Sequence, residues 1–285
     1  MKISVIAPVK NEVQFIGYSI MAVLPYVHEI IYTCAGSSDG TDELLAHIKE
    51  KYAGDKLKLF YSIEPGEVGD AAGNFDFNPH DMKAYNAAFN YAIGKATGDA
   101  CWFLHPDMIV TKWSEVPFTD KAMAWYTNVT SFAKDFNTVI TKGRCDKWKN
   151  IHAKKLGLHY FGGYGSQNED FYHSAITETT HKHYGTDFSQ YPFMVADSGI
   201  NVNHYCELKP YERRLEKMKL CLNTLGVTDE KAAEEMAEQH PRVTLEPSSE
   251  RFGKFEFSES NVSVPEVFSK HKEEFEQFKK QEVTV

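Results

Sequence analysis

The sequence predicts an α/β protein built on a mixed, mostly parallel sheet flanked by helices. Short β-rich apolar runs alternate with amphipathic stretches over the first hundred residues, which is typical of a parallel sheet covered on both faces. The first run, Ile3 to Pro8, is apolar enough for a central buried strand. With 285 residues, of which 42% are hydrophobic, the chain can bury a sizeable core.

The predicted elements follow one another up to residue 104. Four strands are expected, at 3–8, 29–33, 57–62 and 101–104. Three helices separate them, at about 13–24, 41–52 and 81–97, each with an apolar face. The connection from Glu64 to Pro79 is long and Gly-rich, so we expect a functional loop or lid there.

The pattern after residue 116 is less regular. Weak periodicity continues to about His204, and the chain is then expected to become helical, with helices at 211–225 and 228–240. The tail from Val264 to Lys280 is expected to dock through one apolar stripe, made of Val264, Val267, Phe268, His271, Phe275 and Phe278.

Composition and charge narrow the function classes. The formal net charge of −9 disfavours a protein that coats nucleic acid. Five widely spaced cysteines without a C-x-x-C pair indicate neither a disulfide framework nor a structural zinc site. The sequence has no apolar run long enough to span a membrane and no signal-peptide pattern, so we expect a cytoplasmic protein.

Unusual segments follow the predicted strands, where an α/β sheet binds its ligands. They are Pro8-Val-Lys-Asn-Glu12, Cys34-Ala-Gly-Ser-Ser-Asp-Gly-Thr41, His105-Pro-Asp107 and, further on, Gly162-Gly-Tyr-Gly-Ser-Gln-Asn-Glu-Asp170. None matches G-x-G-x-x-G or G-x-x-x-x-G-K-[ST], so the dinucleotide-binding and P-loop interpretations fail.

In this order and spacing, the segments resemble the inverting family-2 glycosyltransferases of the GT-A fold. The resemblance covers roughly Lys2 to Tyr205. The first segment matches that family's P-x-x-N-E-like loop, and the second matches part of D-D-G-S-x-D-G-T. Asn90-Tyr-Ala-Ile-Gly-Lys-Ala-Thr-Gly-Asp99 matches its helix N-x-[AG]-[IL]-x-x-A-x-G-[DE], which leads into the strand before the metal motif.

The resemblance implies a sugar transferase with a GT-A domain at 1–205 and a mainly helical extension at 206–285. Residues 1–110 would form its nucleotide-sugar half and 111–205 its acceptor half. The implied donor is a nucleotide-diphosphate sugar, most simply a UDP-sugar. The acceptor stays open among a glycan, a lipid, a protein and a modified nucleic-acid base, and the C-terminal helices are a possible homo-oligomer contact.

The resemblance also implies a divalent metal. The family's D-x-D motif appears here as His105-Pro-Asp107, and His204 stands where many GT-A enzymes have a further metal-ligating histidine. Imidazole plus carboxylate suits Mn²⁺ better than Mg²⁺. The alternative is that His105 is a hydrogen-bonded residue at a strand end and His204 a surface residue.

By the same resemblance, Pro8, Val9, Lys10 and Glu12 would hold the base and ribose. Ala35 stands where the family has an aspartate that binds uracil. The remaining donor residues lie on the helix at 81–97, near the expected diphosphate, and are Lys83 and Asn86. The alternative for Lys10 and Glu12 is a solvated helix start, and Ser37, Ser38 and Asp39 are expected to serve as turn and capping residues.

Glu169 and Asp170 match the family's acidic pair near the acceptor. Inverting transfer needs a carboxylate that takes the acceptor's proton, so Asp170 is the expected general base, with Glu169 orienting it. The alternative is an N-terminal helix cap that begins at Ser166 or Asn168.

Two rival functions remain open. One is a non-catalytic GT-A-like module that binds a nucleotide or carbohydrate, because the metal motif and the base-reading position are altered. The other is a sugar nucleotidyltransferase, but the Gly- and Arg-rich loop after its first strand is absent here.

Overall fold

The computed structural model describes most of the first 115 residues and selected parts of the remainder. The described residues are 1–68, 71–75, 82–115, 124–133, 135–142, 147–154, 158–161, 170–173, 195–205, 208–215, 219, 234, 256–260 and 262–280.

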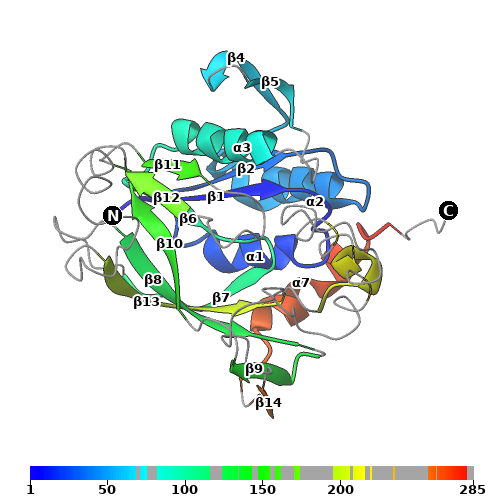
Figure 1. Cartoon of the computed structure of the whole chain (residues 1–285). Helices are drawn as coiled ribbons and strands as arrows, with labels where there is room; N and C mark the ends of the chain where they lie inside the picture. The colour runs from blue at the N-terminus through cyan, green and yellow to red at the C-terminus, as the bar shows by residue number, and fades with distance from the viewer. Residues whose placement is uncertain are drawn as a thin grey trace.

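An eight-stranded sheet forms the centre of the described structure (Figure 1), in the order β3-β2-β1-β6-β10-β8-β13-β7. In chain order, its strands are β1 (Ile3–Val9), β2 (Glu29–Cys34), β3 (Leu57–Phe60), β6 (Ala100–Phe103), β7 (Met108–Lys112), β8 (Ala124–Ser131), β10 (Lys147–Ala153) and β13 (Val195–His204). The pairs β1–β2, β1–β6, β2–β3 and β8–β13 are parallel. The pairs β6–β10, β8–β10 and β7–β13 are antiparallel. The predicted mixed, mostly parallel sheet is therefore confirmed.

Helices cover both faces of the sheet around β1. Helix α3 (Met82–Lys95) packs against β1 and β2, and α1 (Ile16–Val23) lies on the opposite side of β1 in Figure 1. The side chains of β1 and β2 are almost all buried, which explains why their sequences are nearly continuous apolar runs.

Helix α2 (Thr41–Ile48) continues through a π-helical turn (Lys49–Ala53) and a short 3₁₀ turn (Gly54–Lys56). Asp42 and Glu43 lie in its first turn, where the helix dipole favours negative charge. The helix predicted at 41–52 is thus confirmed in extent.

The Gly-rich connection contains regular structure that the sequence did not predict. Strands β4 (Ser62–Val68) and β5 (Ala71–Asn74) form an antiparallel hairpin, with Ser62 opposite Asn74. In Figure 1 this hairpin projects beyond α3. The expected functional loop or lid from 64 to 79 stays a prediction, and the hairpin forms part of that segment because backbone pairing between two short strands outweighs low β-propensity.

The C-terminal region adds a strand and a helix to the body. Strand β14 (Glu256–Glu259) pairs with β9 (Thr138–Lys142), and α7 (Glu266–Glu276) packs on α1. A strand was not predicted in this extension. Of the predicted helices, 211–215 is described as helical, whereas nearly all of 228–240 lies outside the described residues.

The stripe predicted on the tail docks as expected at its centre. His271 and Phe275 are buried, and Phe268 packs against Tyr18 with ring centroids 4.5 Å apart. Val264 departs from the prediction, because it precedes α7 and is exposed.

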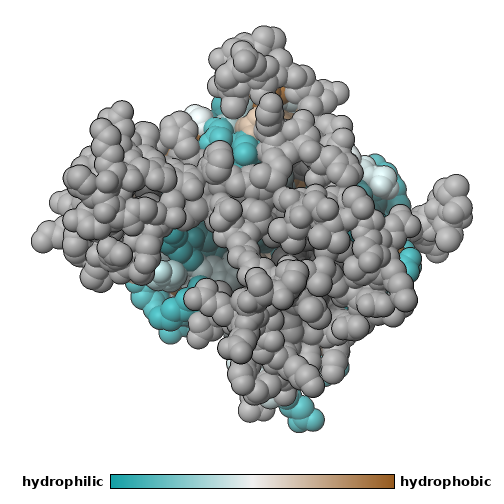
Figure 2. All heavy atoms as spheres, in the orientation of Figure 1, coloured by the Kyte–Doolittle hydropathy of each residue, from teal (hydrophilic) through white to brown (hydrophobic). Residues whose placement is uncertain are grey.

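The two remaining described strands, β11 (Leu158–Phe161) and β12 (Asp170–His173), pair with each other. In Figure 2 the described residues that reach the visible surface are mainly hydrophilic. Among the described helices, none is both long and apolar enough to cross a membrane.

Candidate functional site

The order of the strands reverses direction between β1 and β6. The chain runs from β1 outward to β2 and β3, and then returns to add β6 on the other side of β1. In open α/β sheets, ligands bind at such a reversal, beyond the carboxyl ends of the strands. Glu12 follows β1 and Asp107 follows β6, so both carboxylates lie at this reversal.

Polar contacts join the loops after β1 and β2 into one unit. The Asn11 amide donates to Ser37 Oγ at 3.0 Å, and the Ser38 amide donates to Asn11 Oδ1 at 2.9 Å. Asn11 has a φ of 54°, a left-handed conformation that asparagine tolerates better than most residues. The Glu12 amide donates to Thr41 Oγ1 at 2.7 Å. The turn role predicted for Ser37, Ser38 and Asp39 agrees with these contacts and with those of Asp39 itself.

A buried lysine joins the two carboxylates. Lys209 Nζ donates to Glu12 Oε1 at 2.8 Å and to Oε2 at 2.6 Å, and it lies 2.8 Å from Asp107 Oδ2. The side chains of Lys209, Asp107 and Glu12 are only 4%, 2% and 12% exposed. Glu12 and Asp107 therefore share one ammonium cation in a water-poor setting, where charge pairing is strong.

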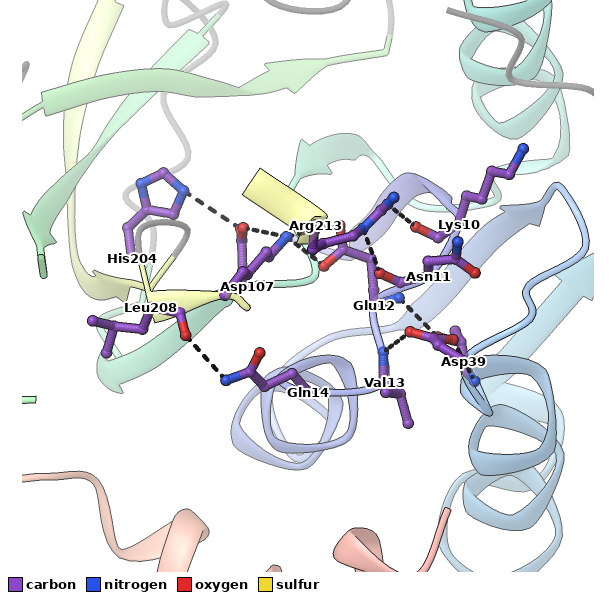
Figure 3. Close-up of polar contacts among 12 residues, drawn as sticks. Lys10, Asn11, Glu12, Val13, Gln14, Asp39, Asp107, His204, Leu208 and Arg213 are labelled. Atoms are coloured by element: carbon purple, nitrogen blue, oxygen red, sulfur yellow. Dashed lines mark hydrogen bonds and ion pairs between the residues drawn. The ribbon is translucent and has the colours of Figure 1, made fainter. Parts of the chain in front are cut away.

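Two histidines and a tryptophan adjoin this cluster. His204 Nε2 lies 3.4 Å from Asp107 Oδ1, and Figure 3 shows the imidazole pointing toward that carboxylate. The ring centroid of His105 lies 6.1 Å from that of His204, and Trp148 packs edge-on against both rings. The interpretation of His204 as a surface residue is wrong, because β13 carries it into the interior, where it is 3% exposed.

The segment after β13 also holds the loop that contains Lys10 and Glu12. Arg213 donates from Nε to the Asn11 carbonyl at 3.0 Å and from Nη2 to the Lys10 carbonyl at 2.5 Å. Gln14 Nε2 donates to the Leu208 carbonyl at 3.1 Å. The side chain of Lys10 points away from Glu12 and Asp107 (Figure 3).

Asp107 Oδ1 and His204 Nε2 are two donor atoms whose chemistry and spacing would suit one divalent ion. Two donors bound to one ion at about 2.0–2.2 Å and roughly tetrahedral or octahedral angles lie about 3.0–3.5 Å apart. The 3.4 Å between His204 Nε2 and Asp107 Oδ1 agrees with that spacing. Within the described part of the chain, no three His, Cys, Asp or Glu side chains are grouped closely enough to hold a metal. Metal binding by Asp107, His204 and His105 therefore stays a prediction.

The other residues predicted to bind the nucleotide-sugar donor lie on β1, after β2 and on α3. Pro8 and Val9 end β1, and the Val9 carbonyl accepts from the Ala35 amide at 3.1 Å. Lys83 and Asn86 lie on α3. Asn86 Oδ1 is buried and accepts no hydrogen bond within the described structure.

The thiol of Cys34, at the end of β2, is buried. Burial, with a smaller contribution from Asp42, raises the pKa of this thiol to about 12. Cys34 is therefore protonated at neutral pH and does not supply a thiolate.

The predicted base belongs to a separate small sheet. Asp170 begins β12 and lies opposite Phe161 of β11. Strand β11 packs against α3. The alternative of a helix that begins at Ser166 or Asn168 is wrong for Asp170–His173, because these residues form a strand; Ser166 and Asn168 themselves lie outside the described residues. Glu169 lies outside the described residues.

Sequence reasoning missed two cations of the site, Lys209 and Arg213. Both follow His204, beyond the part of the chain that carries the quoted motifs. Their spacing of four residues near a predicted helix start was the only available signal.

Comparison with known proteins gives structural neighbours only. No family model matches the chain, and no curated protein matches it with significant similarity. Glucosyl-3-phosphoglycerate synthase from Mycobacterium tuberculosis, bound to phosphoglyceric acid, is 14% identical with a TM-score of 0.42, covering 80% of this chain and 81% of its own.

Two further solved structures are similar to a comparable degree. The same M. tuberculosis enzyme with Mn²⁺, UDP-glucose and phosphoglyceric acid has 14% identity and a TM-score of 0.39, covering 80% of this chain and 81% of its own. S. aureus TarS 1–349 has 14% identity and a TM-score of 0.35, and the match covers 83% of this chain and 69% of the TarS chain. With TM-scores below 0.5, none of these structures establishes the activity of this chain.

Proposed function

We propose that the chain is a glycosyltransferase that moves a sugar from a nucleotide-diphosphate donor to an acceptor hydroxyl. The observation that carries the proposal is the meeting of Glu12, Asp107, His204 and Lys209 at the strand reversal beside β1. This is where an α/β sheet binds nucleotides. The motif resemblance from Pro8 to Asp107 supplies the reaction class.

The loops after β1 and β2 would hold the nucleoside of the donor, most simply a UDP-sugar. Backbone groups of Pro8 and Val9 and the segment at Lys10 line the start of this region, and Ala35 lies beside Val9. Asn86 would face the donor with its buried Oδ1, and Lys83 lies one helical turn before it. The absence of an aspartate at Ala35 leaves recognition of the base to backbone groups.

Asp107 and His204 would hold a divalent ion, with Mn²⁺ favoured over Mg²⁺ because one ligand is an imidazole. Such an ion neutralises the charge that develops on the leaving nucleoside diphosphate. The chain's own contribution is to exclude water around these groups, because Asp107, His204 and Lys209 are all buried.

Asp170 would act as the general base. In inverting transfer, a carboxylate takes the proton of the acceptor hydroxyl while the oxygen attacks the anomeric carbon from the face opposite the leaving group. Glu169 would orient the base or the acceptor. The acceptor itself stays open.

A thermal-shift titration tests donor binding. UDP-, GDP-, dTDP- and CDP-sugars are each added with and without Mn²⁺ to the wild-type chain, Asp107→Asn and Asp197→Asn. Asp197 is a matched control, because it also pairs with a lysine, Lys147, but at an exposed position. One donor should raise Tm only with Mn²⁺ in the wild type and in Asp197→Asn, and Asp107→Asn should lose the effect.

Release of the nucleoside diphosphate separates an enzyme from a binding module. Slow donor hydrolysis, which requires Asp107, supports the transferase. Donor binding without turnover in the presence of candidate acceptors favours the non-catalytic module. If no nucleotide sugar raises Tm, the proposal is wrong.

A further inference from the structure

Lys209 holds the oxygen of the Asp107 carboxylate that does not face His204. Its ammonium lies 2.8 Å from Asp107 Oδ2, while the other oxygen of the same carboxylate faces His204. A dication bound to Oδ1 and His204 would therefore stand within a few ångströms of a fixed positive charge. At that distance repulsion is strong, because the site is shielded from water.

Glu12 offers the ammonium an alternative position. Both of its carboxylate oxygens accept from Lys209 Nζ, at 2.8 and 2.6 Å. An ammonium that leaves Asp107 thus keeps two charge-assisted hydrogen bonds to Glu12 and stays charged. The exchange needs only a shift at the flexible end of a lysine side chain.

The charges of Glu12, Asp107 and Lys209 also favour a shift of the ammonium toward Glu12 when a dication binds Asp107. Among the contacts that the described residues show, Glu12 and Asp107 share the single ammonium of Lys209. Adding a dication while Lys209 stays on Asp107 would put two cations on one carboxylate. Transfer of the ammonium to Glu12 gives each carboxylate its own cation.

We infer that Lys209 and a divalent cation compete for Asp107, so that Lys209 sets how tightly the site binds metal and Glu12 receives the displaced ammonium. The inference rests on the metal site of the proposed function and is independent of sugar transfer. Lys209 acts here as a positioning residue through its contact with Asp107.

Direct titration with Mn²⁺ tests the competition. The electron paramagnetic resonance signal of free aqueous Mn²⁺ is followed as the full chain is added, without nucleotide. Lys209→Gln removes the charge but keeps hydrogen-bond donors for the carboxylates, and it should bind Mn²⁺ at least tenfold more tightly than the wild type. Lys209→Arg retains the cation and should stay within about threefold of the wild type.

Matched variants assign the effect to this site. Lys58 also pairs with a buried carboxylate, that of Glu29, so Lys58→Gln should leave the Mn²⁺ affinity unchanged. Adding Asp107→Asn to Lys209→Gln should abolish the gain. Equal or weaker binding by Lys209→Gln, or no detectable binding by it or the wild type, overturns the inference.

A second variant covers the case in which Lys209→Gln does not fold by circular dichroism. Glu12→Gln keeps Lys209 but deprives the ammonium of its alternative carboxylate, so Mn²⁺ affinity should fall at least threefold. Unchanged affinity in Glu12→Gln overturns the inference. If the competition is observed but no nucleotide sugar binds, the proposed reaction fails and the inference stands.

Discussion

Asp39 and Val13 connect the loops that follow the two central strands. The Val13 amide donates to Asp39 Oδ2 at 3.1 Å, although the residues lie in different βα connections. The other oxygen, Oδ1, accepts from the amide and hydroxyl of Thr41 at 3.0 and 2.6 Å. One carboxylate therefore fixes both the start of α2 and the loop that carries Glu12.

Asp39→Ala should lower the free energy of unfolding by about 2–3 kcal/mol, because three donors lose a charged acceptor. Urea denaturation measures the change. The exposed Asp55→Ala on the 3₁₀ turn serves as the control and should stay within about 0.5 kcal/mol of the wild type. Similar values for the two variants would contradict the role of Asp39.

The lowered pKa of Glu29 predicts that the folded protein loses stability in acid. Burial raises its pKa, but hydrogen bonds from Lys58, Ser4 and Thr97 outweigh burial and hold the pKa at about 2. A lowered folded-state pKa stabilises the protein above the unfolded-state value near 4.5, and this stabilisation disappears as pH falls from there toward 2. Its size at neutral pH is on the order of 3 kcal/mol.

Measuring the free energy of unfolding of the wild type and of Glu29→Gln between pH 7 and pH 3 tests the direction of this pH dependence. The wild type should be clearly more stable at pH 7, and the difference should shrink as the pH falls below about 4.5. A difference that stays constant with pH would show that Glu29 keeps the same pKa in both states.

The neighbourhood of Glu12 and Asp107 follows from local sequence. Apolar runs and amphipathic helices predict parallel strands, and the carboxyl ends of parallel neighbours meet at one edge of the sheet. The placement of His204 was predicted only through its resemblance to a metal-ligating position. Its burial depends on the pairing of β13 with β7 and β8, which distant residues determine.

Other features depend on tertiary contacts that leave little local signal. Lys209 is separated from Asp107 by about a hundred positions in the sequence. Local sequence predicts an exposed lysine here, and only the tertiary fold places two carboxylates beside it. Strand β14 exists because β9 offers it a partner. The β4–β5 hairpin likewise has few β-branched residues, so pairing rather than propensity defines it.

Docking of the C-terminal helix depends on the fit between Gly17 and Phe275. A Cβ on Gly17 would lie 2.7 Å from a ring carbon of Phe275, which is 1% exposed. Gly17→Ala should cost about 1–3 kcal/mol by overpacking, and Phe275→Ala about 3 kcal/mol by creating a cavity.

Combining the two substitutions tests the contact. In the Phe275→Ala background, Gly17→Ala should cost almost nothing, because the ring is gone and the gain of about 1 kcal/mol in helix propensity offsets the remaining close contact with Leu44 Cδ2 at 3.3 Å. Thermal or urea unfolding of all four proteins gives the coupling energy. Additive costs would mean that the close approach does not limit stability.

Arg213 should determine how well the loop after β1 is organised for the donor. Its fork donates to the Lys10 and Asn11 carbonyls, and lysine keeps the charge but cannot reproduce the paired geometry. Arg213→Lys should weaken binding of the stabilising nucleotide sugar about tenfold in calorimetric titrations. Full retention of affinity would show that charge alone suffices, and loss of Mn²⁺ binding as well would indicate wider disruption.

Asp170→Asn should separate donor binding from chemistry. A general base contributes about 10²–10⁴-fold, so kcat should fall within this range once an acceptor is found, while the donor Kd changes less than about threefold. Asparagine has nearly the same shape and cannot take the acceptor's proton. Glu169→Gln should cost less, because its proposed role is to orient. If Asp170→Asn weakens donor binding as much as turnover, Asp170 belongs to the donor site; if it leaves kcat unchanged, another group takes the proton.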